Sequence, residues 1–131
     1  MQTTKGQNLD SFRWQNRIIL LVANEPGSEA YASQLLELRS DLDGLKERKI
    51  IVFRVEQERY SRGLQGDHWL KREKEFSDLG STDHEFQCIL IGLDGGVKLQ
   101  ETSVVALKDL FALIDRMPMR RREIMEKAKL K

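Results

Sequence analysis

Apolar residues along the chain gather in short blocks that polar segments and turn residues separate. The run Ile18–Ala23 is continuously apolar and rich in β-branched residues, and the turn-forming residues 24–27 stop it. A short run of this kind predicts a strand that is buried on both faces. Residues 49–55 and 85–92 show the same character and predict a second and a third strand.

In the segments between and after these strands, apolar residues recur at the spacing of a helix face. This spacing predicts three helices, over about residues 29–46, 68–79 and 104–116. Each begins beside residues that commonly cap helices, namely Ser28, Asp67, and Thr102 or Ser103. Gly80 ends the second helix and Pro118 the third. The polar segment 57–67 contains two glycines and predicts a loop.

Asp94-Gly95-Gly96 predicts a tight hairpin turn into a fourth strand, residues 97–100. The resulting order is β-α-β-α-β-β-α, in which two strand–helix–strand units predict parallel strands and the hairpin adds an antiparallel one. We therefore expect an α/β, thioredoxin-like three-layer sandwich, a central mixed sheet with helices on both faces. The expected domain covers residues 11–117, between a flexible segment 1–10 and a basic C-terminal tail 118–131.

Composition fits this picture, since 131 residues with 40% hydrophobic and 33% charged residues make one globular domain. No apolar run approaches the ~20 residues of a transmembrane helix. The polar N-terminal residues 1–17 show no signal-peptide pattern. The chain as written therefore predicts a soluble cytoplasmic protein, or an exported one if a signal was removed.

Four segments together resemble a known family. They are FRWQNRIILLVA at 12–23, GLKERKIIVFRV at 44–55, ILIGLDGGVKL at 89–99 and LFALIDRMPMRRRE at 110–123. The chain is similar over about residues 9–123 to a bacterial family of unknown function that is related to equarin and the sushi-repeat-containing proteins, the P-DUDES group. The resemblance implies a thioredoxin-like, peroxiredoxin-related fold and no established activity.

Thiol redox chemistry lacks its usual residues here. In thioredoxin-like enzymes the reactive cysteine follows the first core strand, at a helix N-terminus that lowers its pKa. Residues 24–29 occupy that place and hold no cysteine, and no proline precedes the third core strand. Cys88, the single cysteine, lies among Ile and Leu residues and is predicted to be an inert part of the core.

The remaining polar groups predict no catalytic residues, cofactor or metal site. His84 and His68 stand beside carboxylates, but side chains that are adjacent in sequence diverge, so solvated loops explain them better. One cysteine and two histidines are too few for a Cys/His zinc site. The glycines after Asp94 lack the helix and the lysine of a phosphate-binding loop, so we interpret them as a turn.

Charge is distributed unevenly although the net charge is only +1. Residues 116–131 carry seven basic and two acidic residues, whereas the remainder carries 15 basic and 19 acidic ones. Arg120, Arg121 and Arg122 could bind an acidic partner or phosphate, or Arg116 and Arg120 could pair with carboxylates of the body while the others are solvated. Nucleic acid is disfavoured, because no aromatic stacking platform accompanies the arginines.

The sequence thus favours a non-catalytic thioredoxin-like module that acts by binding. Two surfaces are the candidates: the Arg120–Arg122 cluster, and the loop made of Asn24, Glu25, Pro26, Gly27 and Ser28. The alternative is a cysteine-independent or peroxiredoxin-derived enzyme whose remnant site is that loop. Ile124, Met125 and Leu130 could extend a short amphipathic helix that docks on the body or on a second subunit to form a homodimer.

Overall fold

A mixed sheet forms the centre of the protein, whose computed structural model describes residues 9–64, 66, 68–71 and 84–129. The strand order is β4-β3-β2-β1-β5-β6. The strands are β1 (Arg17–Ala23), β2 (Ile50–Glu56), β3 (Arg59–Arg62), β4 (Leu70–Lys71), β5 (Phe86–Ile91) and β6 (Val97–Glu101). The helices are η1 (Leu9–Phe12, a 3₁₀ turn), α1 (Glu29–Arg39), α2 (Leu42–Glu47), α4 (Leu107–Asp115) and α5 (Pro118–Lys129).

The central strand β1 runs parallel to β2 and antiparallel to β5. Every residue of β1 and of β5 is buried, including the polar Arg17 and Gln87 among otherwise apolar residues. The expectation that the third core strand is parallel to the first is wrong. The chain passes through β3 and β4 between β2 and β5, so the connection is no simple strand–helix–strand crossover and the handedness rule does not apply to it.

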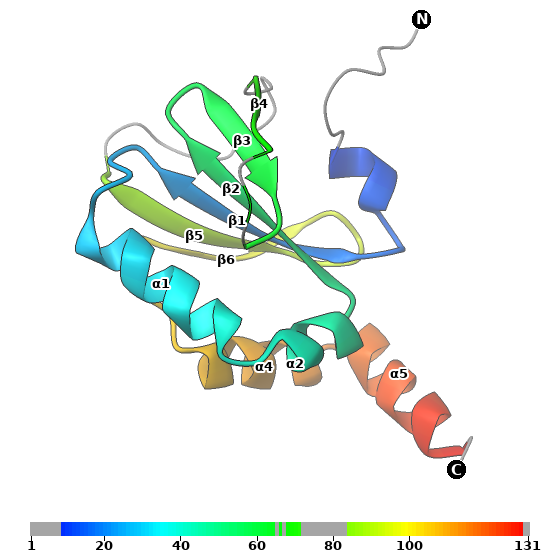
Figure 1. Cartoon of the computed structure of the whole chain (residues 1–131). Coiled ribbons are helices and arrows are strands. Elements are labelled where there is room, and N and C mark those ends of the chain that lie inside the picture. Colours follow the sequence, from blue (N-terminus) through cyan, green and yellow to red (C-terminus); the bar gives the residue numbers. More distant parts are fainter. Residues whose placement is uncertain (1–8, 65, 67, 72–83, 130–131) are drawn as a thin grey trace, which may run out of the picture.

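The two faces of the sheet are covered differently (Figure 1). Helices α1, α2 and α4 lie against one face, where Leu38, Leu45, Leu110 and Ile114 join the core. On the other face η1 contributes Leu9 and Phe12, and β4 contributes Leu70. The helix expected over residues 68–79 is wrong at its start, because Leu70–Lys71 pair with β3, and residues 72–79 lie outside the described part of the chain.

The helix expected over residues 29–46 is divided into two. Ser28 caps α1 as predicted, since its Oγ accepts a hydrogen bond from the amide of Tyr31 at 3.3 Å. The chain then turns at Ser40, and Asp41 caps α2 through a 2.9 Å bond from the amide of Gly44. A Cβ atom on Gly44 would stand 2.7 Å from the ring of Phe111, so the glycine lets α2 approach α4 closely.

Helix α4 begins later than expected, at Leu107, and neither Thr102 nor Ser103 caps it. Its first amide bonds instead to the carboxylate of Glu37, at 2.7 Å, so α1 supplies the cap. The hairpin before it is as predicted. Gly95 takes a φ of 86°, and the amide of Gly92 donates to the carbonyl of Gly96 at 2.9 Å.

Strand β3 lies within the segment that was expected to be a loop. It pairs antiparallel with β2 and buries Tyr60 completely. The chain reverses through Gln57, which has a φ of 50° without being a glycine. The polar residues on either side of Tyr60 hide this strand from hydropathy alone.

Candidate functional site

The loop of residues 24–28, a candidate surface from the sequence, is held at the carboxyl end of β1. The side-chain amide of Asn24 donates to the carbonyl of His84 at 2.8 Å, and the amide of Glu25 donates to the carbonyl of Glu85 at 3.1 Å. The hydroxyl of Ser28 is used as the cap of α1. Glu25, Pro26 and Gly27 are exposed. The loop is therefore tied to the chain before β5 and presents a carboxylate, and no thiol, to solvent.

A buried phenol lies near this loop, on the first turn of α1. Tyr31 donates a 2.7 Å hydrogen bond to the carboxylate of Glu56, at the end of β2. Burial raises the pKa of Tyr31, and the hydrogen bond to Glu56 raises it further. The phenol thus stays protonated at neutral pH and serves as a hydrogen-bond donor that joins α1 to the sheet.

Cys88 faces the helix layer in the middle of β5 and is fully buried. Burial raises the pKa of its thiol to about 12, with a smaller contribution from the charge of Glu101. At neutral pH only about one thiol in 10⁵ is then ionised, so the reactive thiolate is essentially missing. Across the described residues, no cluster of three or more His, Cys, Asp or Glu side chains could hold a metal ion.

The three tail arginines are divided by the structure between core and surface. Arg120 is 4% exposed and is the buried residue of α5. Its guanidinium bonds to Asp115 of α4 at 2.9 Å, to Glu47 of α2 at 2.9 Å and to Glu123 at 3.3 Å. Arg120 therefore fastens α5 to the body, whereas Arg121 and Arg122 are exposed.

Two more arginines extend this group, which we call the arginine clamp: Arg17, Arg48 and Arg120 with Glu47, Asp115 and Glu123. Arg48 bonds to both carboxylate oxygens of Asp115, at 3.1 and 2.9 Å. Arg17, only 1% exposed, donates to the carbonyl of Arg48 at 2.9 Å and to Glu123 at 3.3 Å. Its Nε has no hydrogen-bond partner among the described residues, and an unpaired buried donor of this kind lowers stability.

The clamp shifts the acidity of its own members. Burial alone would raise the pKa of Asp115, but the hydrogen bonds from Arg48 and Arg120 outweigh it and the pKa falls below its usual value. The hydrogen bond from Arg120 also lowers the pKa of Glu47. Both carboxylates are thus ionised at neutral pH, and the clamp is a stabilising ion-pair network rather than an acid–base pair.

The outward side of α5 forms a basic groove. Arg121 and Arg122 line it with Arg116, Lys129, Pro118, Met125 and Glu126. Met125 is 61% exposed, so the groove offers an apolar contact among four cations and one carboxylate. Sequence reasoning singled out Arg121 and Arg122 but missed the clamp partners Glu47 and Arg17. Glu47 lies 73 residues from Arg120, and Arg17 lies 106 residues from Glu123, so neither carries a local signal.

A family match covers most of the chain. The family described as "Domain of unknown function (DUF4174)" matches residues 8–123. The chain belongs to the DUF4174 family. No curated protein matches this DUF4174 domain. None of its described helices is long and apolar enough to cross a membrane.

A solved structure resembles the DUF4174 domain in fold. It is described as "Crystal Structure of Plasmodium vivax 2-Cys Peroxiredoxin, Reduced", with a TM-score of 0.60 and 14% sequence identity. The alignment covers 88% of the DUF4174 domain and 85% of the peroxiredoxin chain. An identity this low shows the fold alone, which is the expected thioredoxin-like α/β fold.

Proposed function

We propose that this DUF4174 domain is a non-catalytic binding module that engages an acidic partner through the basic groove of α5. The proposal rests on one observation: neighbouring arginines of α5 differ in burial, with Arg120 buried and Arg121 and Arg122 exposed. Arg120 is buried among three carboxylates and fixes the helix, and this fixing holds Arg121 and Arg122 outward. A helix that is already ordered loses little conformational entropy when it binds.

The chemistry of the groove indicates the kind of partner. Four cations surround Met125, and the groove has one carboxylate, Glu126. Arginine favours carboxylates through paired hydrogen bonds, and an exposed methionine adds an adaptable apolar contact. An acidic peptide segment that carries apolar side chains matches both features.

The alternative function, an enzyme that works through loop 24–28, has weaker support. The loop hydroxyl of Ser28 is committed to a helix cap, and the nearby Tyr31 has a raised pKa and a carboxylate partner. Cys88 is buried with a raised pKa. A peroxidase or disulfide-reductase activity that Cys88→Ala abolishes would replace the binding proposal with a redox one.

The test uses a fluorescein-labelled peptide of glutamate and leucine, with fluorescence anisotropy at low salt. The double variant Arg121→Glu/Arg122→Glu should bind it on the order of tenfold more weakly, since two attractive charges become repulsive. Lys71→Glu/Lys108→Glu makes the same change of charge at two exposed lysines that lie outside this groove, and this variant should bind normally. Equal loss in both variants, or tighter binding of single-stranded DNA than of the peptide, would refute the proposal.

A further inference from the structure

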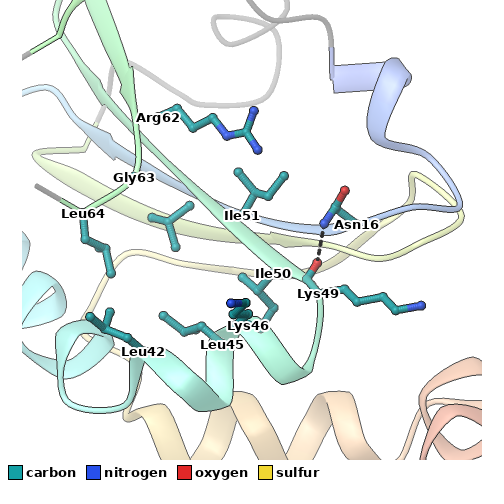
Figure 2. A pocket seen from close by; sticks show the side chains of 11 residues that line it. Asn16, Leu42, Leu45, Lys46, Lys49, Ile50, Ile51, Arg62, Gly63 and Leu64 are labelled. Atoms are coloured by element: carbon teal, nitrogen blue, oxygen red, sulfur yellow. Dashed lines mark hydrogen bonds between the residues drawn. The ribbon is translucent and has the colours of Figure 1, made fainter.

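A second cavity lies beside the sheet, where β3 stops short of the beginning of β2 (Figure 2). Strand β3 pairs with β2 only from Phe53 onward, so residues 50–52 form an edge. A cleft of about 550 Å³ lies against this edge, between α2 and residues 62–64. Its volume is within the range of about 300–1,000 Å³ that is usual for small-molecule sites. We call it the edge cleft.

The floor of the edge cleft is apolar. Leucines from α2 and from the chain after β3 meet the first residues of β2 there: Leu42, Leu45, Leu64, Ile50 and Val52. Figure 2 shows the three leucines pointing toward one another across the cavity. Leu42 is 51% exposed, so its side chain offers apolar surface that an apolar ligand would bury.

The rim of the edge cleft is basic. Lys46, Lys49 and Arg62 line it, and no carboxylate does among the residues that the structure describes. None of the three forms an ion pair with a carboxylate of the described chain, although the guanidinium of Arg62 lies 5.4 Å from the ring centre of Phe12. In Figure 2 the side chain of Arg62 lies above the leucines, and that of Lys49 extends to the right, away from them.

Backbone strain marks the same rim. Lys49 has a φ of 56°, a conformation that residues other than Gly, Asn and Asp rarely adopt. Its carbonyl accepts bonds from the amide of Arg17 at 2.8 Å and from the side chain of Asn16 at 3.3 Å, which hold it in place. Strain of this kind clusters at ligand sites, and a lysine at this position puts a cation on the rim.

We propose that the edge cleft binds a single-chain amphipathic carboxylate, of the fatty-acid class. The apolar floor receives the hydrocarbon chain, and the basic rim receives the carboxylate. Addition of a peptide strand to the edge is disfavoured, because the carbonyl of Val52 already accepts a 2.7 Å bond from the amide of Gly63. The edge that remains is too short for a stable strand. This proposal is independent of the basic groove of α5.

Isothermal titration of the whole chain with dodecanoate, below its micellar concentration, tests the proposal. Dodecanol and dodecyltrimethylammonium are the matched probes, since they keep the apolar chain and remove or reverse the charge. The expected result is saturable binding of one dodecanoate per chain, with binding of the other two at least about tenfold weaker. Leu42→Asp should weaken dodecanoate binding by a similar factor, because it places a carboxylate on the floor.

Charge reversal on the rim completes the test. Lys46→Glu/Arg62→Glu should weaken dodecanoate binding at least about tenfold, whereas Lys71→Glu/Lys108→Glu, outside both proposed sites, should leave it unchanged. Thermal unfolding of each variant establishes that the fold persists, and Lys46→Gln replaces the double variant if that one is unfolded. Absence of saturable dodecanoate binding overturns the proposal. So does equal affinity for the three probes, or binding of the acidic peptide in the cleft in place of dodecanoate.

Discussion

Replacing Arg120 with methionine tests whether the arginine clamp holds α5 on the body. The change keeps a long apolar stem and removes three charge-assisted hydrogen bonds, to Asp115, Glu47 and Glu123. Removing one member of a fully buried ion pair lowers the free energy of unfolding by roughly 3–5 kcal/mol, because the partner charge stays buried without an opposite charge. Here each carboxylate keeps another cation: Arg48 for Asp115, Arg17 for Glu123 and Lys127 for Glu47. We therefore expect a smaller loss, about 2–3 kcal/mol.

Urea unfolding followed by circular dichroism measures this loss, and amide hydrogen exchange locates it. Arg120 is the buried residue of α5, so the helix should exchange much faster in Arg120→Met than in the wild type, while β1 stays protected. Arg122→Met is the matched control, because its side chain is exposed and should change stability by less than about 0.5 kcal/mol.

Acid should affect the two proteins differently. The folded-state pKa values of Asp115 and Glu47 are lowered, so the unfolded chain binds more protons in acid. Their contribution to stability is complete above the unfolded pKa, near 4, and is lost as pH falls through the folded values. Wild type should thus lose stability more steeply below about pH 4 than Arg120→Met does. Identical acid slopes, together with unchanged exchange in α5, would refute the clamp.

Three further changes test other features. Cys88 should not react with a thiol reagent until the chain unfolds, because burial raises its pKa to about 12, and fast labelling of the folded protein would contradict this. Because the pKa of Cys88 is raised, the free energy of unfolding should fall as pH rises above about 9. Urea titrations at several pH values should show a smaller fall for Cys88→Ala. Gly95→Ala should lower the free energy of unfolding by about 1 kcal/mol, because φ is 86° at this position. An unchanged urea midpoint would count against the turn geometry. Lys49→Gly should raise the free energy of unfolding by roughly 0.5–1 kcal/mol, because glycine adopts the positive φ without strain. The same variant should bind dodecanoate more weakly. A lower free energy of unfolding would argue against strain at Lys49.

The sequence predicted the parts of the fold that local chemistry determines. The core strands β1, β2 and β5 are near their expected positions, because continuous apolar runs have few other stable solutions. Ser28 and the Asp94-Gly95-Gly96 turn are confirmed, since a cap and a hairpin turn depend on residues close in sequence. The family resemblance implied the same fold, and the likeness to the peroxiredoxin structure agrees with it.

The parts that the sequence missed depend on distant residues. The cap of α4 comes from Glu37, 70 positions away, so Thr102 and Ser103 were plausible but wrong. Strand β3 is paired although only Tyr60 of its four residues is a large apolar one. Pairing of Arg120 with carboxylates of the body was one of two expectations, and the structure shows it. Arg17 was not expected to take part, and it is buried because Glu123 of α5 reaches it.

The two proposed binding surfaces lie at the end of the sheet opposite to loop 24–28. Loop 24–28 follows the carboxyl end of β1, whereas the edge cleft and the clamp meet the beginnings of β1 and β2, at Asn16 and Arg17. Helix α2 joins them, because Lys46 lines the cleft while the adjacent Glu47 binds Arg120. The edge cleft and the basic groove of α5 are therefore connected through one short helix that packs on the sheet.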